Sequence, residues 1–212
     1  YYLAAGIVAH STNYTSVSTS DGSISAIAVG AAYGIDAQSV YGNVRVNSSN
    51  SIEAVGIVLG ARGIQATSEY GYVALGNSGD IYAGSLYGDA IGIYAYSADG
   101  SVTLGNGGDI TAISYYGLAD GIFASGTTVG VENSGAIEVY GYTWAAGIEA
   151  QGADSATVSN AGDITVIAPG FLQVQDYYGV IGHAPGAQAF GIYTTGGEGG
   201  VDLPNSGKTT AN

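Results

Sequence analysis

Residues 102–110 read VTLGNGGDI, residues 73–81 read VALGNSGDI, and residues 156–164 read ATVSNAGDI. Within this phrase, apolar residues alternate with small or polar ones, which is typical of a strand that has one buried face. A phrase that returns along a chain is the sequence signature of a repeat architecture. We therefore expect the fold to be built from stacked copies of one unit.

A second motif, Gly-Ile-x-Ala, sets the length of that unit. Its glycines are Gly6, Gly34, Gly63, Gly92, Gly121, Gly147 and Gly191. One unit cannot bury its own apolar face, whereas stacked neighbours can. The sequence therefore predicts an all-β fold, a right-handed parallel β-helix (β-solenoid) of about seven coils of about 29 residues, with three short strands per coil.

The repeats cover the whole chain. We expect residues 1–212 to form a single β-solenoid domain, with a loop insertion at about 167–190 where the regular spacing breaks. The chain starts and stops inside the repeat pattern. This fits either a section of a longer array or a unit that stacks end to end.

One column of the repeat predicts an amide ladder. Its members share the parity of the apolar residues and are Asn77, Asn106, Asn133 and Asn160, preceded in the first two coils by Ser20 and Ser48. Stacked amides can hydrogen-bond from coil to coil, and a buried asparagine without such partners would be costly. The glycine two residues later, replaced once by Asn50, predicts a turn in the left-handed backbone region.

The composition excludes several classes of function. The formal net charge is −14, and the only Lys and Arg residues are Arg45, Arg62 and Lys208, so we expect no nucleic-acid partner. No apolar run is long enough for a transmembrane helix, so we expect no direct membrane insertion of this segment. The chain has no Cys, which excludes disulfides and thiolate metal sites.

Residues for catalysis are sparse. His10 and His183 are the only histidines, and no metalloprotease, nucleophile-elbow or phosphate-loop motif occurs. We therefore expect no catalytic residues, no cofactor and no enzyme. Asp80 and Asp109 occupy one slot on adjacent coils; they are candidates for a loosely bound Ca²⁺, or they cap the glycine turn and face solvent.

Two groups of aromatic residues are candidates for a contact surface. The first group precedes the Gly-Ile motif and comprises Tyr87, Tyr116, Tyr142 and Trp144. The second lies in the insertion and comprises Phe171, Tyr177 and Tyr178. Tyrosine suits an exposed sheet surface in any case, but rings in a row also form a platform for sugar rings or for a neighbouring rod. The insertion either binds a partner or covers one face of the solenoid.

The stretch GIYAYSADGSVTLGNGGDITAIS, residues 92–114, resembles the repeats of bacterial autotransporter (type V secretion) passenger domains. The resemblance covers about residues 1–166 and 189–209. It implies a structural or adhesive rod, extracellular or on the bacterial outer surface, that acts in adhesion, aggregation or biofilm. The implied partners are host or bacterial surface glycans and proteins, or further copies of the chain. It transfers no catalytic residue.

Two other functions remain open from the sequence. Many β-helix proteins bind or cleave polysaccharides, and glycoside hydrolysis needs only a pair of carboxylates at a suitable separation. Repetition alone places many such pairs on a solenoid. The other alternative is a matrix fibre that polymerises through the unpaired sheet edges of its end coils.

Overall fold

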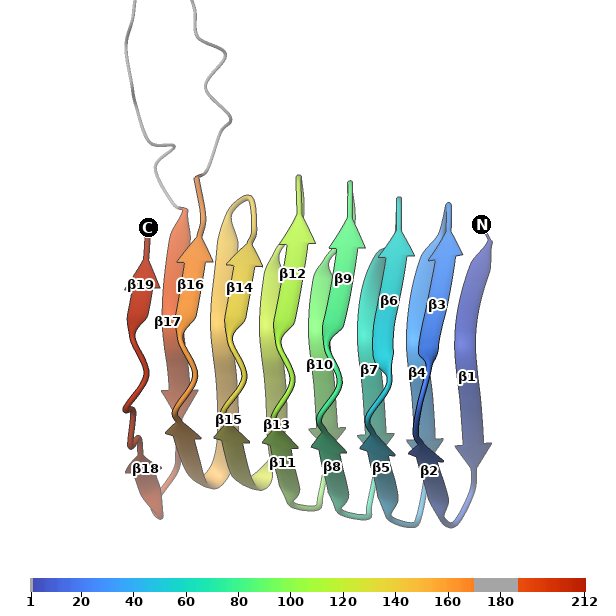
Figure 1. Ribbon diagram of the computed structural model, residues 1–212. Coiled ribbons are helices and arrows are strands. Elements are labelled where there is room, and N and C mark those ends of the chain that lie inside the picture. Colours follow the sequence, from blue (N-terminus) through green and yellow to red (C-terminus); the bar gives the residue numbers. More distant parts are fainter. Residues whose placement is uncertain (1, 170–186) are drawn as a thin grey trace, which may run out of the picture.

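The computed structural model describes residues 2–169 and 187–212. Within these residues the chain winds into a parallel β-solenoid of about six turns with a repeat of about 29 residues (Figure 1). This confirms the all-β solenoid and its repeat length. Each full turn of the solenoid runs from one copy of a motif to the next. The seven copies therefore span about six turns. No described segment forms a helix that could cross a membrane.

Each coil contributes one strand to each of three stacks. The stack that we call the β1 sheet contains β1 (Leu3–Ser11), β4 (Ala31–Ser39), β7 (Gly60–Ser68), β10 (Ala90–Ser97) and β17 (Gln188–Thr195). The β2 sheet contains β2 (Thr15–Thr19), β5 (Val44–Ser48), β8 (Val73–Asn77), β11 (Val102–Asn106) and β18 (Gly200–Asp202). Two long strands, β13 (Ala119–Asn133) and β15 (Trp144–Asn160), run through both stacks and join them.

The third stack, the β3 sheet, contains seven strands. They are β3 (Ser23–Ala28), β6 (Ser51–Gly56), β9 (Ile81–Ser85), β12 (Ile110–Ser114), β14 (Ile137–Tyr140), β16 (Ile164–Ile167) and β19 (Thr209–Ala211). All pairings between successive coils are parallel. The prediction of three strands per coil therefore holds, apart from the two coils in which β13 and β15 pass the corner without a break.

The core consists of columns of identical or similar side chains. Ile35 pairs with Ile64, and Ile93 pairs with both Ile64 and Ile122 along the β1 sheet. These isoleucines have no solvent-accessible surface, and they face equally buried valine and isoleucine columns from the other two sheets. Burying such a side chain contributes roughly 1.5–3 kcal/mol relative to leaving it exposed. The strict repeat in the sequence thus becomes a continuous apolar column along the rod.

The predicted asparagines lie in one column and are hydrogen-bonded to one another. The Nδ2 group of Asn77 donates to Oδ1 of Asn106 at 2.8 Å, and the same bond joins Asn106 to Asn133 at 2.8 Å and Asn133 to Asn160 at 2.7 Å. Each Nδ2 also donates to the carbonyl of the glycine two residues later. Asn205 extends the column by one further amide. Asn106, Asn133 and Asn160 are therefore each paired on both sides, whereas the buried Oδ1 of Asn77, at the start of the column, has no partner among the described residues.

Two details of this column differ from the prediction. Gly79, Gly108, Gly135 and Gly162 do not have a positive φ, so the expected left-handed turn is wrong there. These glycines are needed because of close stacking: a Cβ on Gly108 would lie 2.1 Å from the carbonyl oxygen of Gly79. In the first coil, Thr19 and not Ser20 lies opposite Ser48. The extra residue before β3 is accommodated at Asp21 and Gly22, which both have a positive φ.

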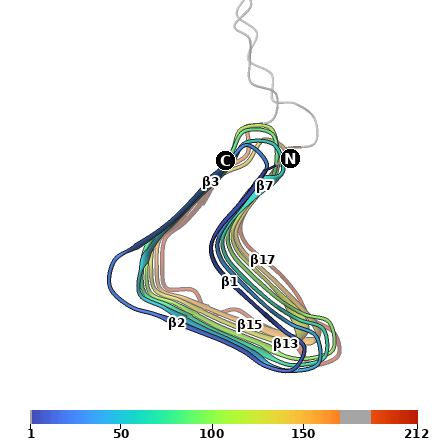
Figure 2. The same ribbon diagram turned by 90° about the vertical axis from the view of Figure 1, so that its right-hand side faces the viewer.

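The Gly-Ile glycines bend the β1 sheet toward the β3 sheet. A Cβ on Gly92 would lie 2.4 Å from Cγ2 of Ile110 in the β3 sheet and 2.5 Å from the carbonyl oxygen of Gly121 in the next coil. Only glycine fits so close an approach. Seen along the rod, each coil consequently has the outline of an L, with the β1 sheet on its inner side (Figure 2).

Candidate functional site

The side chains that the β1 sheet turns away from the core form one face along the rod, which we call the inner face. Its first row of residues in register is Tyr33, Arg62, Ile91, Asp120, Ala146 and Phe190. Its second row is the variable position of Gly-Ile-x-Ala, namely Val8, Asp36, Gln65, Tyr94, Phe123, Glu149 and Tyr193.

Much of the inner face is buried although it lies outside the core. Asp36, Asp120 and Glu149 are only 7%, 3% and 7% exposed, and they are the buried carboxyl groups of the described chain. The L-shaped outline explains this, because the inner side of the bend shelters side chains from solvent (Figure 2). A hollow of about 320 Å³ adjoins this face, with Tyr96, Ser125 and Gln151 in its lining.

Near the N-terminal end, the inner face contains a buried aspartate that is hydrogen-bonded within the protein. The carboxylate of Asp36 lies 2.8 Å from Nε2 of His10, 2.8 Å from Nε2 of Gln38 and 2.9 Å from Nε2 of Gln65. Three donors from three coils therefore surround one buried acid. This arrangement satisfies the carboxylate within the protein and leaves it little capacity for a ligand.

The middle of the inner face is aromatic. The rings of Tyr94 and Phe123 stack across adjacent coils, with centroids 5.0 Å apart and planes at 7°. The guanidinium carbon of Arg62 lies 4.2 Å from the centroid of the Tyr94 ring, on the N-terminal side of the stack. The side chains of Tyr94 and Phe123 are half-buried, so part of each remains open to solvent. The result is a short aromatic platform flanked by a cation.

Toward the C-terminal end, two acids share the surroundings of one indole. Nε1 of Trp144 donates to Oδ1 of Asp120 at 3.2 Å, and Glu149 accepts a hydrogen bond from Gln151. Burial raises the pKa of Asp120 to about 7, and the negative charge of Glu149 adds to that rise. Burial also raises the pKa of Glu149, opposed by hydrogen bonds from Gln151 and Trp144.

Aromatic rings surround this acidic pair. In the second row Glu149 lies between Phe123 and Tyr193. The Trp144 ring contacts Phe190 at a centroid distance of 4.8 Å and Tyr193 at 5.7 Å. Trp144 thus contacts Asp120 of the preceding coil and Phe190 of the following coil. Ala146, which lies between these two residues in the first row, is completely buried. We call Asp120, Glu149, Trp144, Phe190 and Tyr193 the acidic–aromatic cluster.

The predicted tyrosine stripe lies elsewhere on the rod. Tyr87 and Tyr116 are exposed and stack with centroids 5.5 Å apart, and Tyr142 follows at 5.9 Å in a tilted arrangement. Trp144, which the sequence grouped with them, belongs instead to the inner face because it pairs with Gln188 inside the β1 sheet. Phe171, Tyr177 and Tyr178 lie outside the described residues.

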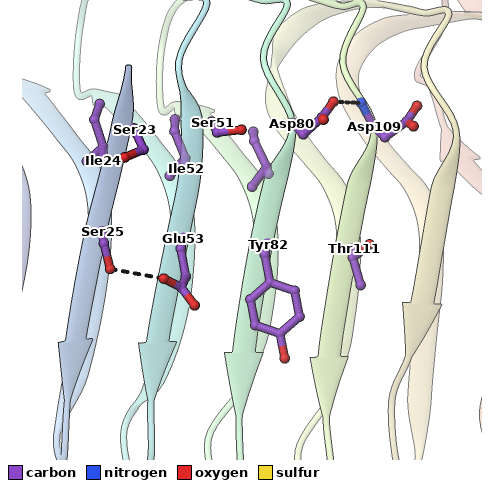
Figure 3. Close-up of a pocket in the computed structure, with 11 residues that line it drawn as sticks. Ser23, Ile24, Ser25, Ser51, Ile52, Glu53, Asp80, Tyr82, Asp109 and Thr111 are labelled. Atoms are coloured by element: carbon purple, nitrogen blue, oxygen red, sulfur yellow. Dashed lines mark hydrogen bonds between the residues drawn. The ribbon is translucent and has the colours of Figure 1, made fainter.

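Asp80 and Asp109 directly precede the neighbouring strands β9 and β12 of the β3 sheet, beside a shallow hollow of about 470 Å³ (Figure 3). Oδ1 of Asp80 accepts the backbone N–H of Asp109 at 3.0 Å, and Oδ1 of Asp109 accepts that of Ala136 at 2.8 Å. Each aspartate therefore caps the backbone N–H at the equivalent position of the next coil. Among the described residues, no group of three or more His, Asp or Glu side chains could hold a metal ion.

The sequence did contain a signal for the inner face. The variable position of Gly-Ile-x-Ala carries Asp36, Gln65, Tyr94, Phe123 and Glu149, residues that differ in size and charge inside an otherwise constant motif. A position that varies within a repeat is open to specialisation, because the stacking of the coils does not fix it.

Comparison with protein families, curated proteins and solved structures finds no match to this chain.

Proposed function

We propose that this chain is a rod of an extracellular or bacterial cell-surface adhesin, and that its inner face binds surface glycans. The observation that carries this proposal is the half-exposed stack of Tyr94 and Phe123 beside buried polar groups on one face of the solenoid. Aromatic faces pack against the apolar faces of sugar rings. Carboxylates accept hydrogen bonds from sugar hydroxyls, and amides can both accept from them and donate to them.

The rod itself supports an adhesive role. Laddered asparagines and continuous apolar columns tie each coil to the next, so the solenoid is a stiff support for a binding face. The resemblance of the repeats to autotransporter passengers favours a location outside the cell, and the absence of Cys is compatible with it. Many weak contacts along one rod would then combine into firm attachment.

Binding to immobilised polysaccharides tests this proposal. We expect the wild-type chain to bind at least one glycan of a panel, and Phe123→Ala to weaken that binding about tenfold, or about 1.4 kcal/mol. Tyr87→Ala is the matched control, because Tyr87 belongs to a stacked pair outside the inner face. Absence of binding to every glycan, or equal losses in both variants, would contradict the proposal.

Cleavage of the bound glycan is a second candidate. Asp120, whose pKa is raised to about 7, lies beside a second carboxyl group, and an acid paired with a carboxylate is the arrangement that glycosidases use. Release of new reducing ends by the wild-type chain, abolished in Asp120→Asn, would establish hydrolysis. Stable glycan with unchanged chain length would leave the protein as a binder.

A further inference from the structure

The acidic–aromatic cluster differs from the other charged groups of the inner face because its acids lack a positive partner. Asp36 has three hydrogen-bond donors around it, and the Arg62 guanidinium lies over Tyr94. Asp120 has only the indole N–H, and within the described part of the chain no Lys, Arg or His forms an ion pair with Asp120 or Glu149. Two carboxyl groups are thus held together in a sheltered place, with no cation of the described chain beside them.

One oxygen of this pair is not completely shut off from solvent. Oδ2 of Asp120 has no hydrogen bond to any described residue, yet it is not one of the unpartnered atoms that are shut off from solvent. The residue as a whole is enclosed by its neighbours, since only 3% of its surface is exposed. An acceptor oxygen that is almost enclosed and unpaired is costly unless a donor from outside binds it.

The walls of the cluster specify the kind of donor. Trp144 donates its indole N–H to Asp120, Tyr193 pairs in register with Glu149, and Phe190 packs against both rings. Ring faces attract cations within about 6 Å, and carboxylates attract them further. The ring faces and the carboxylates repel anionic groups such as uronates, sulfates and phosphates. An ammonium group satisfies both features at once, because it carries a charge for the carboxylates and the rings, and three N–H donors.

We infer that the acidic–aromatic cluster is a subsite for the protonated amine of an amino sugar, within a glycan that lies along the inner face. The inference rests on the proposed glycan binding and adds its specificity. A sugar chain suits this place because the Tyr94–Phe123 platform continues directly into the cluster through Phe123, which pairs with Glu149. The bound sugars thus contact flat rings first and the acidic pair next.

The test compares two oligosaccharides with the same backbone. Isothermal titration with chitosan hexasaccharide, which bears amines, and with N-acetylchitohexaose, which bears amides, is carried out near pH 7. At this pH part of the Asp120 carboxyl group is ionised and part of the amine is protonated. We expect the wild-type chain to bind the amine form about tenfold more tightly, equivalent to about 1.4 kcal/mol. In Glu149→Gln and in Asp120→Asn this ratio should fall to about one.

The matched control is Asp109→Asn, which removes a negative charge at the β3 sheet. It should keep the wild-type ratio. A ratio that falls equally in Asp109→Asn would mean unspecific charge attraction and would overturn the inference. So would a wild-type ratio near one with both oligosaccharides bound, although the proposed glycan binding would then stand.

Three further outcomes are informative. If neither oligosaccharide nor any glycan of the panel binds, the proposed function itself fails. If a lysine-rich peptide displaces chitosan hexasaccharide at a much lower concentration than free N-acetylchitohexaose does, the cluster binds protein amines, and the assignment to a sugar is wrong. If the hexasaccharide is cut during titration, the acidic pair is catalytic and the subsite assignment is likewise overturned.

Discussion

The inner face and the β3 sheet carry the same kinds of residue in different surroundings. Asp120 is almost completely buried beside Glu149, and its pKa is raised to about 7. Asp80 and Asp109 are exposed, and each accepts a backbone N–H of the next coil. Asp120 is therefore a buried acid without a positive partner, whereas Asp80 and Asp109 are exposed caps. The bend of the coil, and not the residue type, makes the difference.

The largest change in the free energy of unfolding is expected from Asp120→Asn. Because the folded chain holds a proton on Asp120 up to a pKa of about 7, against an ordinary aspartate pKa of 3.8, the folded state binds more protons than the unfolded state between these values. The free energy of unfolding therefore falls as the pH rises from about 4 to 7. Asp120→Asn removes this loss and should stabilise the protein by as much as about 4 kcal/mol above pH 7.

Chemical denaturation of both forms at pH 4 and pH 8 measures this. The groups that act on Asp120 are Glu149, Asp89 and the Trp144 indole, and all three remain in the variant. The two proteins should be about equally stable at pH 4. A variant that is less stable than the wild type at pH 8 would show that ionised Asp120 is stabilising, contrary to the comparison of the two faces.

The next effect is expected from Gly92→Ala, which places a methyl group against Ile110 and the Gly121 carbonyl at the bend. Overpacking of this kind costs about 3 kcal/mol, and it should also disturb the inner face. Gly105→Ala is the control, because no atom lies within 4 Å of its Cβ position. Thermal unfolding should show a clear loss for the first variant and none for the second. Equal melting temperatures would mean that the bend does not need glycine.

A smaller effect is expected from Asp109→Ala at the β3 sheet. The substitution removes the acceptor of the Ala136 N–H, which then bonds to water at this exposed site. The free energy of unfolding should drop by about 1 kcal/mol. Urea unfolding measures the change. A gain in stability like that expected for Asp120→Asn would refute the distinction between a cap and an unpaired acid.

The smallest effect is expected from Tyr116→Ala in the exposed tyrosine stripe. Its ring stacks on Tyr87 at 5.5 Å, and such a pair contributes about 0.5–1 kcal/mol beyond burial. Glycan binding should not change, since Tyr116 lies outside the inner face. If this variant lost binding while Phe123→Ala kept it, the stripe would be the contact surface and the inner face a structural one.

The repeat itself could be predicted from particular residues. Ile35, Ile64 and Ile93 recur at a constant spacing, and their alternation with polar neighbours identified buried strands that pair in register. Asn77, Asn106 and Asn133 shared the parity of the apolar residues, which placed them inside the rod in hydrogen-bonding reach of one another. Periodicity carries this information because stacked coils present the same position to itself.

The inner face could not be predicted in the same way. Asp120 and Glu149 lie on different coils and in different rows, and Trp144 was grouped with the tyrosine stripe because it lies in the same connection before the Gly-Ile motif. They come together because β13, β15 and β17 pair in register on the inner side of the bend at the glycine column. The expected left-handed turn failed for a related reason, since the demand for glycine comes from the neighbouring coil and not from the local backbone.

The sequence by itself thus determined a β-solenoid, its repeat length and its internal ladder, because these follow from the periods at which residue types recur. Only the tertiary structure decided which outward residues are sheltered and which are exposed. Burial depends on the L-shaped course of the coil, and burial is what separates Asp120 from Asp109 (Figures 2 and 3). The charge state of an acid follows from its surroundings, which a repeat pattern does not encode.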